Sequence, residues 1–286
     1  MRLKKMTLNE AIDILKAAGV DSPGHDAEEL FYHFGGYGRS TMYLMHKVES
    51  DSPKLIEAVE RRAKREPLQY IIGTAYFYRE KYKVTPDCLI PRFDTEILVD
   101  YAVKNLPDGA TFMDLCTGSG CVAISVLCNT KDTTAIAVDI DGGALAIAAE
   151  NAHTNGVENR IHLRRIDLMC EVVDEPVFAV LSNPPYVSED AYRTLEGEIF
   201  AEPPHAFLGG EDGGDFYRHL TPIYKEKIAN DGFIAYEIGY DQADLLTKIA
   251  EENGMSCEII KDLSGNDRVA VLRMQNSECR MQNCKK

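Results

Sequence analysis

The fold is decided by residues 111–120, TFMDLCTGSG, in which a short apolar run ends in a glycine turn. The apolar run predicts a buried strand at 111–115, and residues 121–128, CVAISVLC, predict a helix directly after the turn. Gly118 and Gly120 allow unusual dihedral angles and close approach of the backbone to a ligand. The succession of strand, glycine turn and helix is typical of the first unit of a doubly wound sheet.

The same alternation of strand and helix continues to the end of the chain. Further strands are predicted at residues 134–139, 161–164, 177–182, 232–238, 257–261 and 268–273. The helices between and before them are predicted at residues 95–105, 142–155, 216–228 and 242–254. Apolar runs such as residues 178–181, FAVL, suit strands that are buried on both faces. We therefore predict an α/β fold with a doubly wound, seven-stranded and mostly parallel sheet.

A helical pattern precedes the sheet. Residues 7–10, TLNE, form a capping-box pattern, which predicts the start of a first helix. Further helices are expected across residues 26–34, after Ser40 and from residue 52 to residue 65. Aromatic and β-branched residues over 68–89 predict a β-hairpin. The expected domains are a helical bundle for substrate recognition at 1–75, a hairpin linker at 76–90, a catalytic sheet domain at 91–274 and a polar tail at 275–286.

Composition narrows the class of protein. The chain has 286 residues, of which 45% are hydrophobic and 27% charged, as in ordinary globular proteins. We expect a cytoplasmic protein without a membrane partner, because no apolar stretch approaches the ~18 residues of a membrane span. Residues 1–75 carry equal numbers of basic and acidic side chains, so the net charge of −15 lies beyond them and disfavours stable nucleic-acid binding. The eight cysteines lack zinc-like spacing, so we expect reduced thiols and no metal.

Acidic residues after the next two strands predict a nucleoside site. Asp139 ends its strand where a carboxylate can accept hydrogen bonds from two ribose hydroxyls. Asp167 closes the following strand unit, where it can accept from an adenine amino group while Leu168 lies against the ring. The glycine turn fits both NAD and S-adenosylmethionine, and by itself it leaves this choice open.

The most informative motif is residues 182–186, SNPPY, directly after the strand at 177–182. Pro184 and Pro185 stiffen the loop and remove two N–H donors, whereas their carbonyl acceptors remain. The Asn183 side chain adds an amide oxygen, and Tyr186 offers an aromatic face for stacking. Acceptors without donors, at the ligand edge of a parallel sheet, suit a planar NH₂ group such as an amide or an exocyclic amine.

These motifs, together with residues 67–73, PLQYIIG, and 89–96, LIPRFDTE, resemble the release factor glutamine methyltransferase family of class I methyltransferases. The resemblance runs from about residue 7 to residue 273 and includes Glu202-Pro203, Glu237-Ile238-Gly239 and the segment 262–268. It implies methylation of the side-chain amide nitrogen of the glutamine in the Gly-Gly-Gln loop of bacterial class I peptide chain release factors. S-adenosyl-L-methionine is then the implied cofactor and S-adenosyl-L-homocysteine the product.

The resemblance also implies roles for individual residues. Those implied to hold the cofactor are Cys116, Thr117, Gly118, Ser119, Gly120, Asp139, Asp167, Leu168 and Asn183. Those implied to hold the glutamine and carry catalysis are Asn183, Pro184, Pro185 and Tyr186, and Arg92 is expected to line the substrate mouth. This chain departs from the family at Cys116, where many relatives have glycine and where a Cβ is expected to narrow the cofactor turn.

Three other functions remain open at this point. An adenine amino-group methyltransferase acting on DNA or RNA has the same need for acceptors, although the acidic sheet domain disfavours it. A non-catalytic module that binds nucleosides does not require the residues at 183–186, so their presence in this chain disfavours it. An NAD enzyme leaves the proline-rich loop without a role. Residues 61–65, RRAKR, are interpreted as a solvated helix face, with contact to a release factor or ribonucleoprotein as the alternative. Thr95 is interpreted as a helix start and Glu237 as a structural acid.

Overall fold

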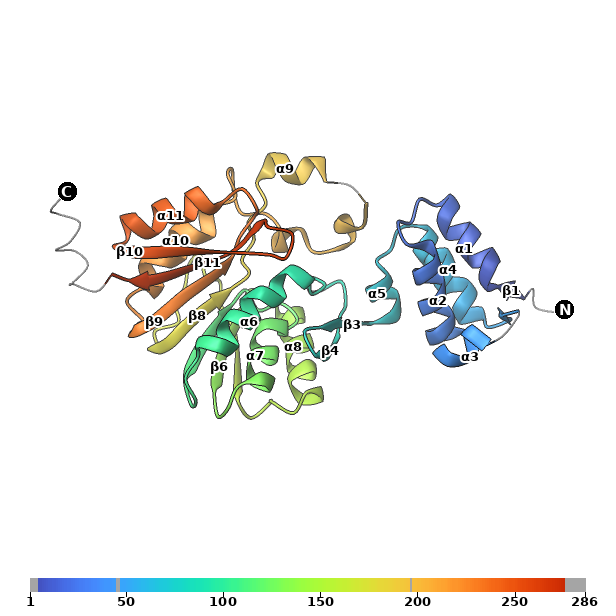
Figure 1. Ribbon diagram of the computed structural model, residues 1–286, viewed down its shortest axis with the longest axis horizontal. Helices are drawn as coiled ribbons and strands as arrows, with labels where there is room; N and C mark the ends of the chain where they lie inside the picture. Colours follow the sequence, from blue (N-terminus) through green and yellow to red (C-terminus); the bar gives the residue numbers. More distant parts are fainter. Residues whose placement is uncertain (1–4, 45–46, 196, 276–286) are drawn as a thin grey trace. The chain divides into compact units, whose positions relative to one another are not determined.

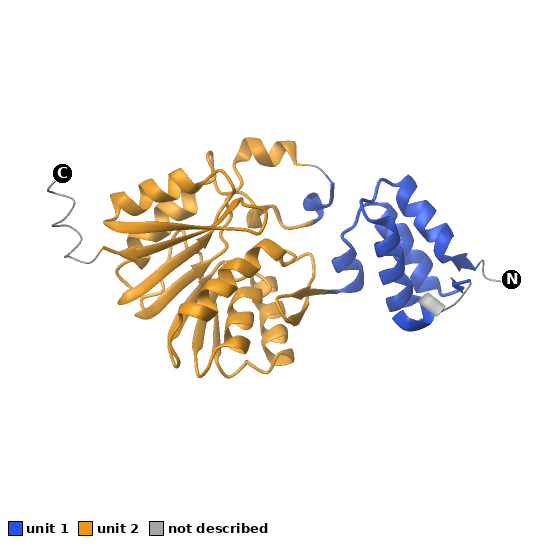
Figure 2. Cartoon of the chain, viewed as in Figure 1, with its two compact units in different colours: residues 1–74, 196–201 blue, residues 75–195, 202–286 orange. Residues whose placement is uncertain are grey.

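The computed structural model describes residues 5–44, 47–195 and 197–275, and the chain divides into two compact units. One unit comprises residues 1–74 and 196–201, and the other comprises residues 75–195 and 202–286 (Figure 2). Beyond residue 275, the expected polar tail lies outside the described residues, as do Cys279 and Cys284.

The first unit is helical. Its helices are α1 (Leu8–Ala17), α2 (Pro23–Phe34), α3 (Arg39–Leu44), α4 (Pro53–Ala63) and α5 (Leu68–Ile72), and its short strands β1 (Met6–Thr7) and β2 (Glu49–Ser50) pair antiparallel. The expected capping box starts α1, because the Thr7 hydroxyl accepts from the Glu10 amide (3.2 Å) and the Glu10 carboxylate accepts from the Thr7 amide (2.8 Å). Leu15, Phe31 and Leu55 are fully buried in its core.

The basic run at the end of α4 is the predicted solvated face only in part, because Lys64 is exposed and Arg62 is buried. Arg62 is only 4% exposed, and its guanidinium donates to Asp26 (2.7 Å) and to Glu198 (2.7 Å), both in the same unit. Arg61 pairs with Glu66. Arg62 therefore links α4 to α2 and to Glu198 within this unit, since a buried guanidinium requires partners for its charge.

The predicted hairpin is shorter than the stretch 68–89 that indicates it, and it begins at residue 74, two residues before the expected linker at 76–90. Residues 68–72 form α5 instead of a strand, and this helix buries Leu68, Tyr70 and Ile71. Gly73 ends α5 with a left-handed conformation (φ 78°), which favours glycine. The hairpin itself consists of β3 (Thr74–Phe77) and β4 (Glu80–Lys83).

The second unit contains the seven-stranded sheet, in the order β10-β11-β9-β8-β5-β6-β7 (Figure 1). Its strands are β5 (Thr111–Leu115), β6 (Thr134–Asp139), β7 (Ile161–Arg165), β8 (Val177–Ser182), β9 (Ile228–Glu237), β10 (Met255–Lys261) and β11 (Asp267–Met274). The strands from β9 to β7 pair parallel, and β11 pairs antiparallel with β9 and β10. This arrangement confirms the predicted α/β fold with a mostly parallel sheet.

Helices cover both faces of the sheet (Figure 1). One face packs against α6 (Glu96–Asn105), which follows η1 (Phe93–Thr95), and against α7 (Cys121–Asn129) and α8 (Gly142–Thr154). The other packs against α10 (Asp215–Tyr224) and α11 (Ala243–Glu252). Alternate residues of β5 divide between the two cores: Phe112 joins one, and Met113 and Leu115 the other. Short helices α9 (Glu189–Thr194), η2 (Gly197–Ala201) and η3 (Pro204–Ala206) follow β8.

The topology creates a ligand edge. From β5 the chain proceeds outward to β6 and β7, and it then returns to the opposite side of β5 as β8. The carboxyl ends of β5, β6 and β8 therefore meet at a topological switch point, where open α/β sheets bind their ligands. Within the described residues, no helix has the length and apolar character of a membrane span, and no cysteine is in a disulfide.

Candidate functional site

A cavity of about 360 Å³ opens at the carboxyl ends of β5, β6 and β8. It brings together seven of the residues predicted from the sequence: Cys116, Gly118, Asp139, Asp167, Leu168, Asn183 and Pro185. It also takes in residues that sequence reasoning did not single out, among them Cys88, Met169, His205 and Phe216. The switch point of the sheet is thus also where the predicted motifs converge.

The glycine turn packs against α7 at Gly120 and is open toward the cavity at Gly118. A Cβ placed on Gly120 (φ 81°) meets Ile124 Cδ1 at 2.8 Å, whereas one on Gly118 (φ 54°) has no atom within 4 Å. The buried Thr117 hydroxyl donates to Asp114 Oδ2 (2.6 Å). Gly118 therefore faces the cavity, while Thr117, Ser119 and Gly120 support the turn without lining the cavity.

Cys116 occupies an unusual backbone position. Its φ of 61° lies in the left-handed region, which glycine adopts without strain and other residues adopt at a cost. Burial raises the pKa of its thiol well above the usual value, so the thiol stays protonated and is a poor nucleophile. Glycine therefore suits this position for two reasons: it adopts this φ without strain, and it has no Cβ to occupy space in the turn.

Asp139 is held as an acceptor beside the turn. Its Oδ2 accepts from the Gly118 amide (2.8 Å), and its Oδ1 accepts from the Asp141 amide (3.0 Å). Burial raises the pKa of this carboxyl, and the two amide bonds oppose that rise. Each carboxylate oxygen can accept more than one hydrogen bond, so Asp139 retains acceptor capacity toward the cavity.

Much of the remaining lining of the cavity is apolar. Ile140, Ala144, Ile166 and Leu168 contribute to it, with Asp167 beside Leu168. The Asp167 carboxylate accepts from the Met169 amide (3.0 Å), which fixes the turn after β7. An apolar slot next to a carboxylate suits a flat ring that carries an amino group.

The turn at residues 183–186 begins where β8 ends. The Ser182 hydroxyl donates to the Leu115 carbonyl (2.6 Å) and so ties the end of β8 to the end of β5. Asn183 and Pro185 line the cavity, whereas Pro184 and Tyr186 are not among its lining residues. The Asn183 Nδ2 group donates to the Thr95 hydroxyl (3.2 Å).

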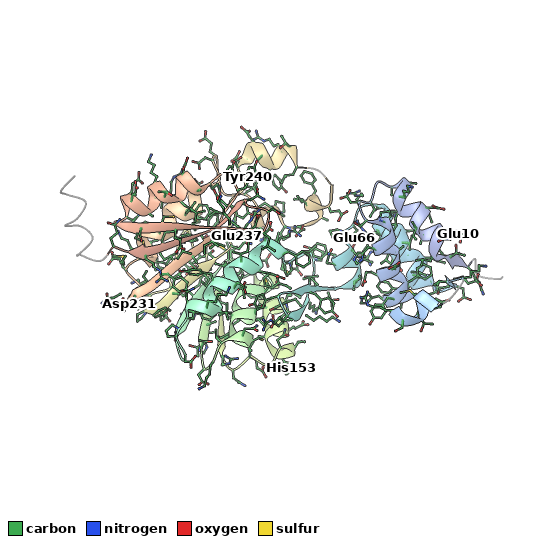
Figure 3. All side chains as sticks on the ribbon, in the orientation of Figure 1. Glu10, Glu66, His153, Asp231, Glu237 and Tyr240 are labelled. Carbon is green, nitrogen blue, oxygen red and sulfur yellow. The ribbon has the colours of Figure 1, made fainter. Side chains whose placement is uncertain are left out.

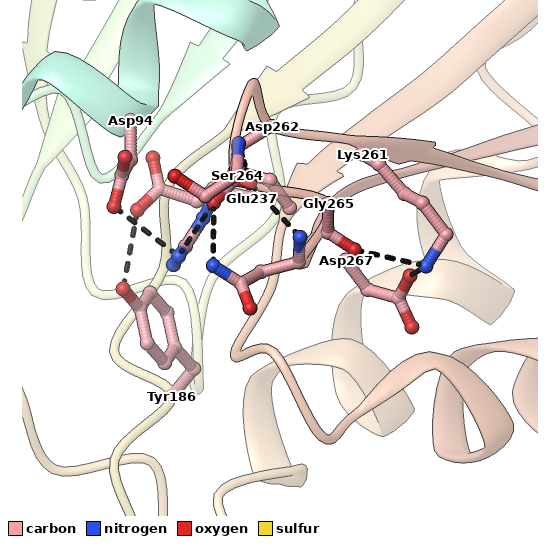
Figure 4. A network of polar contacts seen from close by, with 10 residues as sticks. Asp94, Tyr186, Glu237, Lys261, Asp262, Ser264, Gly265 and Asp267 are labelled. Carbon is pink, nitrogen blue, oxygen red and sulfur yellow. Dashed lines mark hydrogen bonds and ion pairs between the residues drawn. The ribbon is translucent and has the colours of Figure 1, made fainter.

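Glu237, at the end of β9, is a buried acid to which the sequence assigns only a structural role. It is 1% exposed, and its carboxylate accepts from the Thr95 hydroxyl. It also accepts from the Tyr186 hydroxyl at 3.2 Å, and Figure 4 shows this bond. Burial raises the pKa of Glu237 to about 7. Figure 3 shows Glu237 within the unit that contains the seven-stranded sheet. The two residues interpreted as a helix start and a structural acid, Thr95 and Glu237, thus bond to each other and contact the turn.

Arg92 is tied to a buried acid. Its guanidinium pairs with Glu202, which is 4% exposed and also accepts from the Ile90 amide (2.9 Å). Arg92 is not among the residues that line the cavity. Arg268 pairs with Asp94 (3.2 Å) and with Asp262 (3.5 Å), and these two acids are labelled in Figure 4. Both arginines are thus already partnered by carboxylates.

Comparisons with known proteins identify similar chains. Residues 7–73 match the family model of the PrmC N-terminal domain, and residues 93–215 match that of the methyltransferase small domain. A release factor glutamine methyltransferase of Thermodesulfovibrio yellowstonii is 37% identical over 261 residues, which span 88% of this chain and 93% of the relative. One of Fusobacterium nucleatum is 35% identical over 274 residues, spanning 93% and 77%. A solved methyltransferase of Pyrococcus furiosus, 19% identical, shares the fold with a TM-score of 0.50 over 68% of this chain and 89% of that one.

Proposed function

Because this chain belongs to the release factor glutamine methyltransferase family, we propose that it methylates the side-chain amide nitrogen of a glutamine in a peptide chain release factor. The observation that carries this proposal is the donor-poor turn at residues 183–186 beside the cavity. Pro184 and Pro185 have no N–H group, and one of the two hydrogens of the Asn183 NH₂ group is donated to Thr95, which directs this end of the amide toward Thr95. With Nδ2 directed toward Thr95, Asn183 Oδ1 and the proline carbonyls are the acceptors that we assign to the two hydrogens of a carboxamide.

The residues around the cavity fit S-adenosylmethionine. Gly118 leaves open the space that a Cβ would fill, and Asp139 has the acceptor capacity for the two hydroxyls of a ribose. The slot beside Leu168 has room for an adenine ring, and the Asp167 carboxylate can accept from the amino group of that ring. We assign these four residues to cofactor binding, with the backbone of Cys116 and the side chain of Asn183. The bound cofactor supplies an electrophilic methyl group.

The chain's own contribution to catalysis is to hold and polarise the glutamine. An amide nitrogen is a weak nucleophile because its lone pair is delocalised into the carbonyl. Asn183 Oδ1 and the Pro184 carbonyl accept its two hydrogens, which fixes the orientation of the nitrogen and raises its electron density. They also stabilise the positive charge that develops on nitrogen during the reaction. No strong base is needed beforehand, since the methylated nitrogen is acidic and releases its proton readily.

Orientation supplies much of the rate enhancement in such a site. Holding two reactants in line is worth up to ~7–11 kcal/mol in favourable cases. Tyr186 contributes an aromatic face, and its hydroxyl bond to Glu237 fixes the ring. Arg92, paired with Glu202, orders the segment that we assign to the substrate mouth. We assign the helical unit to recognition of the release factor in the cytoplasm.

The proposal is tested by methyl transfer from tritiated S-adenosylmethionine to purified release factors. We expect label on a release factor with the Gly-Gly-Gln loop and none on the same protein with that glutamine replaced by alanine. Duplex DNA is the control substrate, because an adenine amino group also needs acceptors. Label on the DNA and none on the release factor would contradict the proposal.

A further inference from the structure

We propose that Thr95 and Glu237 are positioning residues that decide which end of the Asn183 carboxamide faces the substrate. The inference rests on the proposed function and assigns to two buried side chains a task within it. An asparagine amide has an acceptor end and a donor end of nearly equal size. Only the acceptor end suits a glutamine NH₂ group, so an uncontrolled amide would present the wrong end part of the time.

The first step of the argument concerns the hydroxyl hydrogen of Thr95. Thr95 is 2% exposed and Glu237 1%, so water does not compete for their bonds. The Thr95 hydroxyl donates to Glu237 Oε2. An ionised carboxylate has no hydrogen to give, so the single hydrogen of Thr95 is committed to Glu237.

The second step follows from the oxygen of Thr95. With its hydrogen used, this oxygen can only accept, and the partner within reach is Asn183 Nδ2 at 3.2 Å. A flipped amide would set Asn183 Oδ1 against another acceptor, and a buried unpaired acceptor is unfavourable. The chain of bonds from Glu237 through Thr95 therefore holds Nδ2 inward and leaves Oδ1 for the substrate.

The same carboxylate also fixes the far end of the turn. Glu237 Oε1 accepts from the Tyr186 hydroxyl (3.2 Å), and the Glu237 backbone carbonyl accepts from the buried Tyr217 hydroxyl (2.8 Å). Glu237 is thus anchored through its main chain. Its carboxylate holds Tyr186 directly through Oε1 and Asn183 indirectly, through the bond from Thr95 to Oε2. One buried acid therefore sets the geometry of the whole acceptor turn.

The arrangement depends on the charge of Glu237. The titratable and charged groups near its carboxylate come from five elements: Asp94 of η1, Cys121 of α7, Tyr186 after β8, Tyr217 of α10 and Arg268 of β11. Arg268 lowers the pKa of Glu237 and Asp94 raises it, while burial has the largest effect and brings the pKa to about 7. Burial also raises the pKa values of Cys121, Tyr186 and Tyr217, which therefore stay neutral near pH 7.

Protonation of Glu237 removes the constraint on the Asn183 amide. A neutral Glu237 has a hydrogen that it can donate to the Thr95 oxygen, and the Thr95 hydrogen is then free for Asn183 Oδ1. Either end of the amide then has a bond to Thr95, so the NH₂ group also faces the glutamine part of the time, donor against donor. Glu237 loses its proton as the pH rises through its pKa, so the productive arrangement is selected above about pH 7 and the selection is lost below it.

The test uses Thr95→Val, which keeps the shape and removes the hydroxyl, Thr95→Ser, which keeps the hydroxyl, and Glu237→Gln. Tyr236→Phe is the matched control. It removes a buried hydroxyl from the residue next to Glu237 in β9, and this hydroxyl accepts from Thr221 and not from Thr95 or Asn183. We expect kcat for the release factor to fall ~10-fold or more in Thr95→Val and Glu237→Gln, as one lost oriented bond implies. Thr95→Ser and Tyr236→Phe should stay within ~3-fold of the wild type, which is below the effect of one such bond.

A second readout separates positioning from a general structural defect. A release factor whose loop glutamine is replaced by glutamate presents only acceptors, so the wild type should bind it poorly relative to glutamine. In Thr95→Val the Asn183 amide is free to turn, and we expect this preference to shrink ~10-fold, the equivalent of one hydrogen bond. Unchanged kcat and an unchanged preference in a folded Thr95→Val variant would overturn the inference.

A third readout needs no substrate and keeps the inference separate from the proposed function. In the ligand-free protein, the NMR signals of the Asn183 side-chain NH₂, identified by their loss in Asn183→Asp, should shift with a midpoint near pH 7. Glu237→Gln and Thr95→Val should abolish that shift, while Tyr236→Phe and Thr95→Ser retain it. A wild type that methylates no release factor yet shows this titration would refute the function alone. Signals that titrate equally in all variants would refute the positioning role alone.

Discussion

Asp139→Asn tests the cofactor half of the site most sharply, because it changes one oxygen into an NH₂ group. Asp139 accepts from two backbone amides, of Gly118 at 2.8 Å and of Asp141 at 3.0 Å. An asparagine has a single acceptor oxygen, so one of these two amides must face a donor. The asparagine side chain otherwise keeps the size and shape of the aspartate side chain.

The magnitude follows from the bonds lost. A buried amide left without an acceptor costs about 1–3 kcal/mol of unfolding free energy. A hydrogen bond from a ribose hydroxyl to a carboxylate is worth about 1.5–3 kcal/mol. Loss of one such bond raises the Kd for S-adenosylhomocysteine ~10- to 150-fold. The kcat at saturating cofactor should change much less, because the substrate turn is untouched.

The assay is calorimetric titration with S-adenosylhomocysteine, paired with chemical denaturation. Asp141→Asn is the matched control, because this neighbouring carboxylate caps α8 by accepting from the Gly143 amide (2.6 Å) and does not line the cavity. Asparagine is as good an N-cap as aspartate, so the control should keep cofactor affinity within ~2-fold and lose little stability. A Kd of Asp139→Asn within threefold of the wild type would refute the assignment of Asp139 to the ribose.

Three further predictions concern other parts of the chain. Asn183→Ala should lower kcat ~100- to 1000-fold, as loss of an oriented polar group in an active site does, while the cofactor Kd measured by calorimetry changes far less. Wild-type turnover in this variant would contradict the catalytic role of Asn183. Cys116→Gly removes a left-handed non-glycine residue from the cavity, and titration should show equal or tighter cofactor binding, with weaker binding counting against the strain argument. Arg62→Ala leaves the Asp26 carboxylate buried and unpaired, so denaturation should show a loss of about 3–5 kcal/mol, against at most about 1 kcal/mol for the more exposed Arg61→Ala; equal effects would contradict this interpretation.

The sheet was predictable because its central strands are marked in the sequence by short apolar runs. The bounds predicted for β5, β6 and β8 are those of the structure, since buried parallel strands are continuous apolar runs. The predicted helix at residues 216–228 instead ends at Tyr224, and β9 begins at Ile228. Pairing of Ile228 with Val177 of β8 extends β9 across the polar residues 230 and 231, which do not indicate a strand. Tertiary pairing here overrides local composition.

Short elements and long-range pairs were not predictable in the same way. Residues 68–72 have the composition of a strand, yet they form α5, because the buried side of a short helix can outweigh local propensity. Thr95 and Glu237 are 142 residues apart, and Arg62 and Asp26 are 36 apart. No spacing rule links such residues, since only the folded sheet or bundle brings them together. Sequence reasoning thus found the motifs that face the cavity and missed the buried residues that support them.

The central claim is that a rigid, acceptor-only turn holds the glutamine with its nitrogen toward the cofactor. The most direct measurement is a crystal structure of the enzyme with S-adenosylhomocysteine and a release factor. We predict that the glutamine nitrogen lies within hydrogen-bond distance of Asn183 Oδ1 and of the Pro184 carbonyl, on the side of the cavity that holds the cofactor sulfur. A glutamine bound elsewhere, or bound with its oxygen toward these two acceptors, would contradict the account.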